Sequence, residues 1–396
     1  MDYVFTPAAD KLKPSAIREI LKLSSAPDII PFSAGNPSPE AFPKETVAKI
    51  TAEIMEENPI GALQYSVTEG YTPLRDYLKK YMKEKYNIGT DDDDLIITCG
   101  AQQVMSLSAT SLAGEGDTIL CESPSFVGSL NALKLTGAKL VGIPMESDGM
   151  SIPALEKAIE ENVNIRLLYV IPNFQNPTGI TTSLEKRKAI YEIAKKNNIL
   201  IIEDNPYGEL YFDQAPPESI KSMDKDGYVI YAGSFSKVLA PGLRVGWCIA
   251  PKTLIAKFTA IKQTQDVHSN ILAQMLAYKF ITEHDFEGHL AYLREIYTKK
   301  ANFFMSLMDK HIAPEITYQK PTGGLFVWCK LPDGVDMPTF CTRAVKEFKT
   351  AVVPGSAFDI APCDNQYFRI NYSTPTNEQI EKGMAYLEAL KKDVLK

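Results

Sequence analysis

The chain has 396 residues, of which 45% are hydrophobic and 23% are charged, and its formal net charge is −7. This length suits two domains, and the ordinary composition indicates a folded globular protein. The acidic balance argues against nucleic-acid binding and against docking on an anionic membrane. No run of about 18 apolar residues predicts a membrane span, and Met1-Asp2-Tyr3 does not open a secretory signal, so we expect a cytoplasmic protein.

Residues 1–45 are proline-rich and irregular, apart from one helical segment that begins at Pro14. An apolar stripe runs along this segment at helical spacing, and Arg18 lies off it. Gly35 and Asn36 belong to a turn-rich stretch, which is typical of a loose arm or of a site formed against another domain or subunit. We therefore treat residues 1–45 as an N-terminal arm.

Helices are predicted over 44–57 and from about 73 to 86, and then the pattern changes. The acidic run Asp91–Asp94 has no neighbours that would complete a metal shell, so we expect it to be solvated. The six cysteines include no CxxC pair, and four histidines are few for a His-based site. We therefore predict no metal.

Short apolar strands alternate with helical patterns through the middle of the chain. Seven strands are predicted, over 95–98, 118–121, 139–143, 167–171, 199–203, 228–232 and 246–250. Because most are apolar on both faces and separated by helices, they indicate a mostly parallel sheet covered on both sides. This α/β pattern defines a large domain over residues 46–290.

A different pattern follows residue 253. A long, charged helical region extends to about residue 310, and shorter strands are predicted over 316–319, 324–330 and 367–371 before a closing helix over 377–391. We interpret residues 291–396 as a smaller α+β domain that the N-terminal arm completes.

The loop after strand 228–232 carries the clearest chemical signal. It offers Ser234, Ser236 and Lys237, and Arg244 comes seven residues after the lysine. Hydroxyls and a guanidinium suit a phosphate. A lysine in a partly desolvated pocket can lose its proton and form a Schiff base. A ligand that is both a phosphate and a carbonyl compound points to pyridoxal 5′-phosphate (PLP), although an ordinary polar loop is the alternative.

Polar residues follow three further strands of the same predicted sheet. Gly100-Ala101-Gln102 opens a helix, where backbone N–H groups attract anions, and Asn176 lies in an Asn-Pro-Thr-Gly turn. Asp204 at a strand end could keep a pyridinium nitrogen protonated, and Tyr207 could bind a ring oxygen. Taken singly, each has an ordinary structural explanation: Gly100-Ala101-Gln102 as a helix start, Asn176 as a turn residue, Asp204 as a helix cap and Tyr207 as a core aromatic. Their convergence on one sheet edge favours a shared site.

Together the motifs resemble those of fold-type I PLP-dependent aminotransferases of class I/II. The resemblance covers nearly the whole chain and rests on Ser-Phe-Ser-Lys with Pro-Gly-Leu-Arg-Val-Gly-Trp, on Asn-Pro-Thr-Gly and on Asp-Asn-Pro-Tyr. It is strongest to the branch of 2-aminoadipate and kynurenine aminotransferases and the effector domains of fused transcriptional regulators. It implies a PLP-binding large domain with a seven-stranded, mostly parallel sheet, plus the smaller domain.

The resemblance assigns a role to each cofactor-binding residue. It implies that Lys237 forms the Schiff base, that Asp204 pairs with the pyridine nitrogen, and that Tyr207 and Asn176 contact the 3′-oxygen. Phe126 matches the aromatic that stacks on the ring, where many relatives have tyrosine. The residues that would hold the phosphate are Gly100, Ala101, Gln102, Ser234, Ser236 and Arg244.

Other matches concern the substrate and a second subunit. Tyr65 matches a tyrosine that reaches the neighbouring subunit's phosphate, which implies a homodimer with shared sites. Arg369 matches the arginine that clamps the α-carboxylate, a task that suits its planar fork; a structural salt bridge is its alternative role. Gly35 and Asn36 match a mobile segment near the substrate. An arginine placed like Arg18 can meet a side-chain carboxylate, and a solvated arginine is the alternative.

The predicted function is transfer of an amino group between an L-amino acid and a 2-oxo acid, with glutamate and 2-oxoglutarate as one pair. Lys237 would be the base, and Asp204 and Tyr207 would act on the cofactor. Two alternatives stay open: a PLP-dependent lyase on the same fold, and a non-enzymatic effector-binding module of the regulator type. The first 45 residues contain no helix-turn-helix unit of the kind that precedes such modules.

Overall fold

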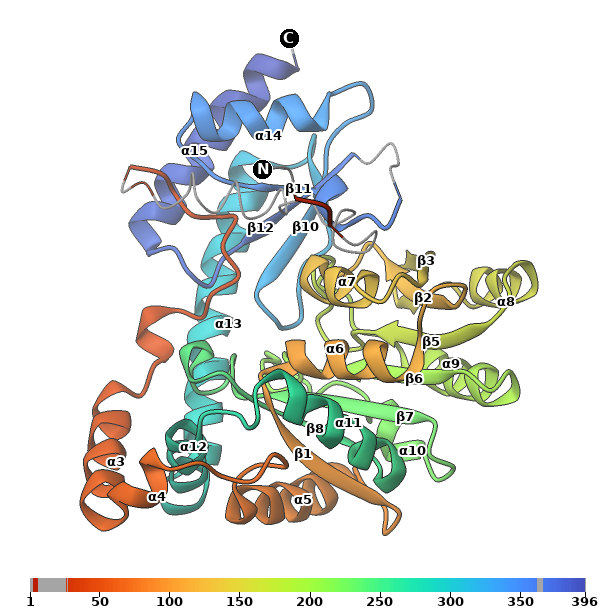
Figure 1. The fold of residues 1–396 in the computed structure, drawn as a ribbon. Helices are drawn as coiled ribbons and strands as arrows, with labels where there is room; N and C mark the ends of the chain where they lie inside the picture. The colour runs from red at the N-terminus through yellow and green to blue at the C-terminus, as the bar shows by residue number, and fades with distance from the viewer. Residues whose placement is uncertain (1–2, 6–25, 27, 362–365, 396) are drawn as a thin grey trace.

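The computed structural model describes residues 3–5, 26, 28–361 and 366–395. Its largest sheet has eight strands in the order β1-β8-β7-β6-β5-β2-β3-β4 (Figure 1). The strands are β1 (Asp93–Cys99), β2 (Thr118–Ser123), β3 (Lys139–Glu146), β4 (Gly149–Met150), β5 (Ile165–Val170), β6 (Leu200–Asp204), β7 (Val229–Ser234) and β8 (Val245–Pro251). The predicted count of seven strands is too low by one, because β4 has only two residues and so carries no hydrophobic pattern.

Strand direction places the polar loops together. β2, β3, β5, β6 and β7 pair in parallel, whereas β8 is antiparallel to both β7 and β1. Since β1 and β7 both oppose β8, the loops after β1, β2, β5, β6 and β7 all leave the same edge of the sheet. β8 begins at that edge, so Arg244, directly before β8, also lies there.

Helices cover both faces of this sheet, as the apolar strands predict. Leu167 and Ile202 pack on the side of α6, α7 and α11, whereas their neighbours Leu168 and Ile201 pack on the side of α8 and α9. The other face near β1 and β8 is covered by α5 and α12. The helices of this part are α3 (Lys44–Glu57), α4 (Pro59–Leu63), α5 (Thr72–Tyr86), α6 (Ala101–Leu112), α7 (Val127–Lys134), α8 (Ile152–Glu161), α9 (Leu184–Lys196), α10 (Ile220–Met223), α11 (Lys252–Gln265) and α12 (Ile271–Glu283).

The helical region predicted over 253–310 is three helices, α11, α12 and α13 (Phe286–His311). Asn270 and Asp285 interrupt it, because each side chain accepts a hydrogen bond from the first turn of the next helix and so caps it. No helix in the described part of the chain is long and apolar enough to span a membrane.

A second sheet has the order β11-β12-β10-β9, with every pair antiparallel. Its strands are β9 (Thr317–Tyr318), β10 (Phe326–Lys330), β11 (Val353–Pro354) and β12 (Tyr367–Asn371), and α14 (Met337–Lys346) and α15 (Asn377–Val394) pack on it. Ile30 and Phe32 from the N-terminal segment are buried in the same core. That segment therefore adds to the smaller unit.

The helix α13 joins the two cores. Leu290 and Leu293 pack in the core of the large sheet, whereas Phe304 and Met308 pack in the core of the small sheet. In Figure 1 this helix, in cyan, runs from α12 toward the small sheet. The domain boundary predicted between residues 290 and 291 lies inside the helix and stays a prediction.

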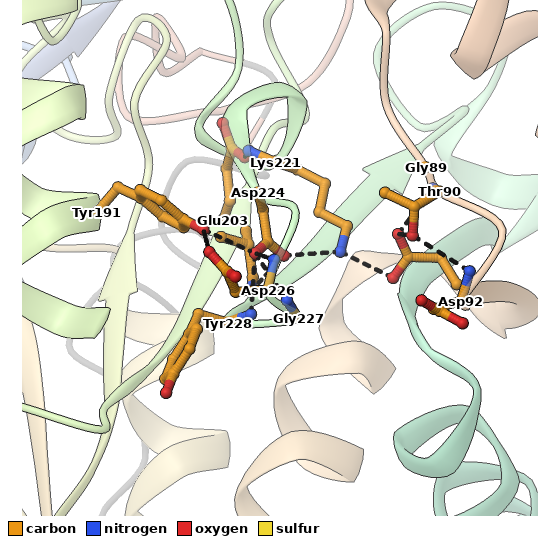
Figure 2. A network of polar contacts seen from close by, with 12 residues as sticks. Gly89, Thr90, Asp92, Tyr191, Glu203, Lys221, Asp224, Asp226, Gly227 and Tyr228 are labelled. Carbon is orange, nitrogen blue, oxygen red and sulfur yellow. Dashed lines mark hydrogen bonds and ion pairs between the residues drawn. The ribbon is translucent and has the colours of Figure 1, made fainter. Parts of the chain in front are cut away.

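A buried ionic network ties β1 to the segment before β7 (Figure 2). The Lys221 side chain is 1% exposed, and its Nζ lies 2.9 Å from both Asp93 Oδ1 and Asp224 Oδ2. Asp224 also accepts from the backbone N–H groups of Tyr228 and Val229. The expectation that Asp91–Asp94 is solvated is therefore wrong for Asp93, whose side chain is 6% exposed, because Lys221 neutralises it from a distant part of the chain.

Replacing Lys221 by methionine is expected to destabilise the protein by about 3 kcal/mol, because two buried carboxylates lose their cation. The control is Lys195→Met, which breaks an exposed ion pair with Asp226 and should cost less than about 1 kcal/mol. Urea unfolding followed by circular dichroism measures both. Equal losses for the two variants would contradict the structural role of Lys221.

Candidate active site

Lys237 lies in the loop after β7, and most of its side chain is buried. Its Nζ donates a hydrogen bond to the carbonyl oxygen of Gly35, 2.8 Å away. Burial, together with the positive charges of Arg369 and Arg244, lowers the pKa of Lys237 to about 8. The sheet edge thus presents an amine that loses its proton far more easily than an ordinary lysine.

The pH dependence of this amine is testable in cofactor-free protein. Only the neutral amine attacks an aldehyde, so covalent capture of PLP at Lys237 should accelerate with rising pH and level off above a pKa of about 8. A lysine of ordinary pKa, about 10.4, would keep accelerating roughly tenfold per pH unit through that range. Borohydride trapping and mass spectrometry of the Lys237 peptide give the rate. In Arg369→Gln the pH at which the rate levels off should be higher, because a positive charge that lowers the pKa of Lys237 is removed. A rate that never levels off would contradict the lowered pKa.

Asp204 ends β6 and is 4% exposed. Its Oδ2 accepts a hydrogen bond from the Tyr169 hydroxyl at 2.8 Å, and that hydroxyl also lies 2.9 Å from Ser129 Oγ. Its Oδ1 is buried and has no partner among the described residues. Burial raises the pKa of Asp204 to about 6, against the opposing effect of the Tyr169 hydrogen bond. An unpartnered buried carboxylate oxygen is costly, and a cationic N–H from a ligand would relieve that cost.

The phosphate-binding residues predicted from β1, β7 and β8 come together. Ser234 Oγ and Ser236 Oγ are 2.9 Å apart, and Arg244 Nη2 donates to the carbonyl oxygen of Cys99 at 3.0 Å. Gly100 has a φ of 70°, and a Cβ on it would lie 2.4 Å from Arg244 Nη2. Only glycine therefore lets the guanidinium approach the start of α6, where the N–H groups of Ala101 and Gln102 belong to the first turn and have no intrahelical acceptor.

Arg369 comes from β12 of the small sheet and is 3% exposed. Its Nη1 donates to Asn176 Oδ1 at 2.7 Å and its Nη2 donates to the carbonyl oxygen of Ser33 at 2.8 Å, whereas its Nε has no partner. The guanidinium lies 4.2 Å from the centroid of the Phe326 ring. Burial lowers its pKa to about 10, so it stays charged at neutral pH. No carboxylate of the described chain forms an ion pair with it, which disfavours the structural salt bridge.

Other predicted residues lie around this centre. Tyr207 is buried, with its ring edge-on to Phe326 at 5.8 Å, and Phe126 precedes α7 beside Gly128. Gln102 Nε2 donates to the carbonyl oxygen of Gly128 at 2.7 Å, which links the start of α6 to the first turn of α7. The carbonyl oxygen of Asn36 accepts hydrogen bonds from the small domain.

Two predicted residues are not part of this cluster. Tyr65 is 81% exposed and lies edge-on to His268, so within one chain it does not reach the site. Arg18 lies outside the described residues.

Several buried polar residues escaped prediction. Besides Tyr169, Glu122 is the penultimate residue of β2, and it accepts from the Ile171 N–H at 3.0 Å and from Gln175 Nε2 at 3.2 Å. Burial raises the pKa of Glu122 to about 8. Arg187 is fully buried and donates to Asn173 Oδ1. The sequence did show that Glu122 and Tyr169 are polar residues within apolar strands. That pattern does not reveal which face of the sheet each side chain occupies, so it could not assign either residue to the site.

Comparison with known proteins identifies the family. A sequence profile of "Aminotransferase class I and II" matches residues 27–387. The chain belongs to the class I and II aminotransferases. Aromatic-amino-acid aminotransferase 1 of Thermococcus litoralis is 36% identical over 403 residues, which cover 100% of this chain and 96% of the relative.

Solved structures agree with this assignment. Kynurenine aminotransferase of Pyrococcus horikoshii, in complex with PMP, has a TM-score of 0.95 at 34% identity, over 99% of this chain and 98% of that one. The α-aminoadipate aminotransferase of Thermus thermophilus, complexed with N-(5′-phosphopyridoxyl)-L-leucine, has a TM-score of 0.90 at 35% identity, over 99% and 98%. This aminotransferase is therefore a PLP-dependent enzyme of fold type I that acts on amino acids and 2-oxo acids, in the aminoadipate and kynurenine branch.

The residues at the sheet edge fit that cofactor. The unpartnered Oδ1 of Asp204 suits a protonated ring nitrogen, and the Arg244 guanidinium, which Gly100 allows to lie close to the start of α6, suits a phosphate. Lys237 supplies an amine of lowered pKa at the same edge of the sheet.

Proposed function

We propose that this aminotransferase exchanges amino groups between an L-amino acid and a 2-oxo acid, with glutamate and 2-oxoglutarate as one pair. The observation that supports the exchange is that one sheet edge carries both an amine of lowered pKa, Lys237, and a carboxylate oxygen without a partner among the described residues, Asp204 Oδ1. Support for an acidic partner comes from the relatives, since one of them is named for α-aminoadipate, a dicarboxylic amino acid. A cytoplasmic location stays a prediction from the sequence.

Each residue of the site would have a separate role in this reaction. Lys237 would bind PLP covalently through Nζ and, once released, take the α-proton of the substrate as a general base. Asp204 would accept from the ring nitrogen and hold its proton, and Tyr169 keeps that carboxylate oriented. Ser234, Ser236, Arg244 and the start of α6 would hold the phosphate. When bound, PLP supplies an electron sink for the charge that remains after the proton leaves.

Arg369 would orient the substrate. Its Nη1 and Nη2 are turned to Asn176 and to the Ser33 carbonyl, so a carboxylate must take over from those neutral acceptors. A carboxylate pairs bidentately with a guanidinium and is the stronger acceptor, so this exchange is favourable. Gly35, whose carbonyl holds Lys237 Nζ, belongs to the same segment as Ser33. Substrate binding would thus release the hydrogen bond to the Ser33 carbonyl, and binding of PLP to Lys237 would release the one to the Gly35 carbonyl.

A homodimer with shared sites completes the proposal. Ile60, Leu63, Tyr65 and Val67 are all more than half exposed and follow one another along α4 and the segment behind it. Contiguous exposed apolar residues of this kind mark protein contacts. A second copy seated on this surface would cover the patch and allow Tyr65 to reach the phosphate of the other subunit.

The test is a half-reaction screen. Purified PLP-loaded protein is mixed with each amino acid in turn, and the absorbance change from the aldehyde to the amine form of the cofactor is followed. Glutamate should convert the cofactor, and 2-oxoglutarate should reverse the change without ammonia release. Ammonia released with the 2-oxo acid would support the lyase instead.

Removing Arg18 probes the choice of an acidic substrate. If Arg18 meets the side-chain carboxylate, then Arg18→Ala should lower kcat/KM for glutamate relative to leucine by about tenfold or more, the value of a charge-assisted hydrogen bond. Arg18→Lys should retain part of the preference. An unchanged ratio in both variants would show that Arg18 is a solvated residue, and would leave the transamination itself intact.

A further inference from the structure

Gln175 is a fully buried residue next to Asn176, in the loop after β5. Glutamine is mostly found at protein surfaces, and a buried side-chain amide is costly unless its polar atoms are bonded. The backbone of Gln175 is fixed at two points. Its N–H donates to the Ile180 carbonyl oxygen at 2.9 Å, and its carbonyl oxygen accepts from the Gly179 N–H at 2.6 Å. The turn therefore holds the base of this side chain.

The partners of the Gln175 side-chain amide determine its orientation. Its Oε1 accepts from the Thr178 N–H at 3.0 Å and from the Thr178 hydroxyl at 2.7 Å. Its Nε2 donates to the Pro124 carbonyl oxygen at 2.8 Å and to Glu122 Oε2 at 3.2 Å. A backbone N–H can only donate and a backbone carbonyl can only accept, so a reversed amide would lose bonds at both ends. Both N–H groups and both lone pairs of the amide are thus in use.

These bonds join the loops that follow β2 and β5. Pro124 lies two residues before Phe126, the aromatic expected to stack on the cofactor ring, and Gln175 is next to Asn176, the amide expected at the 3′-oxygen. The bond from Gln175 Nε2 to the Pro124 carbonyl connects the two loops directly. The Gln175 side chain therefore sets the spacing between the loop that carries Phe126 and the turn that carries Asn176.

Asn176 in turn contacts residues of the substrate and cofactor sites. Because Arg369 can only donate, the atom that meets its Nη1 is the oxygen of Asn176, and Asn176 Nδ2 remains as a donor. The Asn176 amide also forms a hydrogen bond with the Tyr207 side chain. A displacement of the turn would therefore move the donor expected at the 3′-oxygen and would disturb Arg369 as well.

We propose that Gln175 is a positioning residue, which fixes the turn of Asn176 against the loop of Phe126 and so aligns the groups that bind PLP. This inference rests on the predicted contacts of PLP with Phe126 and Asn176. A residue with a structural role alone would, when replaced, lower the stability of the protein without changing the surroundings of the bound cofactor.

The test variant is Gln175→Met, which keeps the length of the side chain and removes its four hydrogen bonds. The readout is the pH at which the absorbance of bound PLP changes, in PLP-loaded protein without substrate. The 3′-oxygen is more negative in the basic form of the bound cofactor, so a donor that faces it lowers this pH. If Gln175→Met displaces Asn176, the absorbance change should move to higher pH by about 0.5–1 pH unit, the value of one hydrogen bond. Equilibrium dialysis should show a PLP affinity lower by about tenfold.

A milder variant keeps the test decisive if Gln175→Met does not fold. Thr178→Val removes the hydroxyl that donates to Gln175 Oε1, so the absorbance change should move in the same direction by a smaller amount. The matched control is Thr118→Val at the opposite end of β2, which removes a buried hydroxyl that donates to the Val163 carbonyl oxygen at 3.0 Å. This control should lower stability in urea unfolding and leave the absorbance change at its original pH.

Asn176→Ala separates this inference from the cofactor contacts on which it rests. The expected result is a shift to higher pH in Asn176→Ala, Gln175→Met and Thr178→Val. A shift in Asn176→Ala alone would overturn the positioning role of Gln175 and leave the cofactor contact intact. No shift in any of the three variants would overturn both. An equal shift in Thr118→Val would show that the absorbance follows stability, and would also overturn the positioning role.

Discussion

Replacing Lys237 by alanine is expected to abolish transamination, with kcat/KM lower by about 10⁴-fold. The variant loses both the covalent link to PLP and the sheet-edge amine whose pKa is lowered to about 8. PLP should still bind without the link, because the phosphate-binding residues and Asp204 are untouched. Steady-state assays with glutamate and an aromatic 2-oxo acid give the rate, and equilibrium dialysis gives the remaining PLP affinity.

The control for this variant is Lys252→Ala at the start of α11, where the side-chain Nζ donates to the Asp91 carbonyl oxygen at the surface. Its activity should match that of the unmodified protein. Normal transamination by Lys237→Ala would show that another residue is the base.

Replacing Asp204 by asparagine is expected to lower kcat/KM by about 10²- to 10³-fold, the usual cost of removing one preorganised electrostatic group. Asparagine has nearly the same shape and can still accept from Tyr169, so the variant tests the charge that faces the ring nitrogen. The cofactor's absorbance spectrum should change with the activity, since the protonation of the ring is affected. Assays with saturating PLP separate this effect from weaker cofactor binding.

A neighbouring carboxylate provides the matched control. Glu203 precedes Asp204 in β6 and is equally buried, but it accepts from Ser219, Ile220 and Lys221 on the other side of the strand. Glu203→Gln should therefore lower stability while leaving the absorbance spectrum of bound PLP unchanged. A similar spectral change in both variants would mean that Asp204 acts through folding alone.

Local patterns were sufficient to predict the parts of the site that follow strands. Lys237, Asp204 and the helix start at Gly100 each come directly after an apolar run, and the parallel sheet then brings them to one edge. Arg244 reaches the same edge for a different reason, since it precedes the one long strand that runs the other way. Sequence periodicity carries no information about strand direction, so that placement required the structure.

Contacts between distant segments could not be predicted from periodicity or local motifs. Asn176 and Arg369 are 193 residues apart in the chain: Asn176 lies in the loop after β5 of the large sheet, and Arg369 lies in β12 of the small sheet. Tyr169 lies in an apolar strand, where a tyrosine normally indicates core packing, and only the neighbouring strand shows that it holds Asp204. The ion pair of Asp93 with Lys221 was missed for the same reason.

The continuity of α13 has a consequence for how the molecule unfolds. Two domains with separate cores often melt in separate steps, each with its own midpoint. Here one helix of 26 residues supplies apolar side chains to both cores, and the loss of either core exposes one half of it. Since fraying of one half weakens the hydrogen bonds that support the other, the free energies of the two domains are coupled. The enzyme should therefore unfold as one cooperative unit, despite its two sheets.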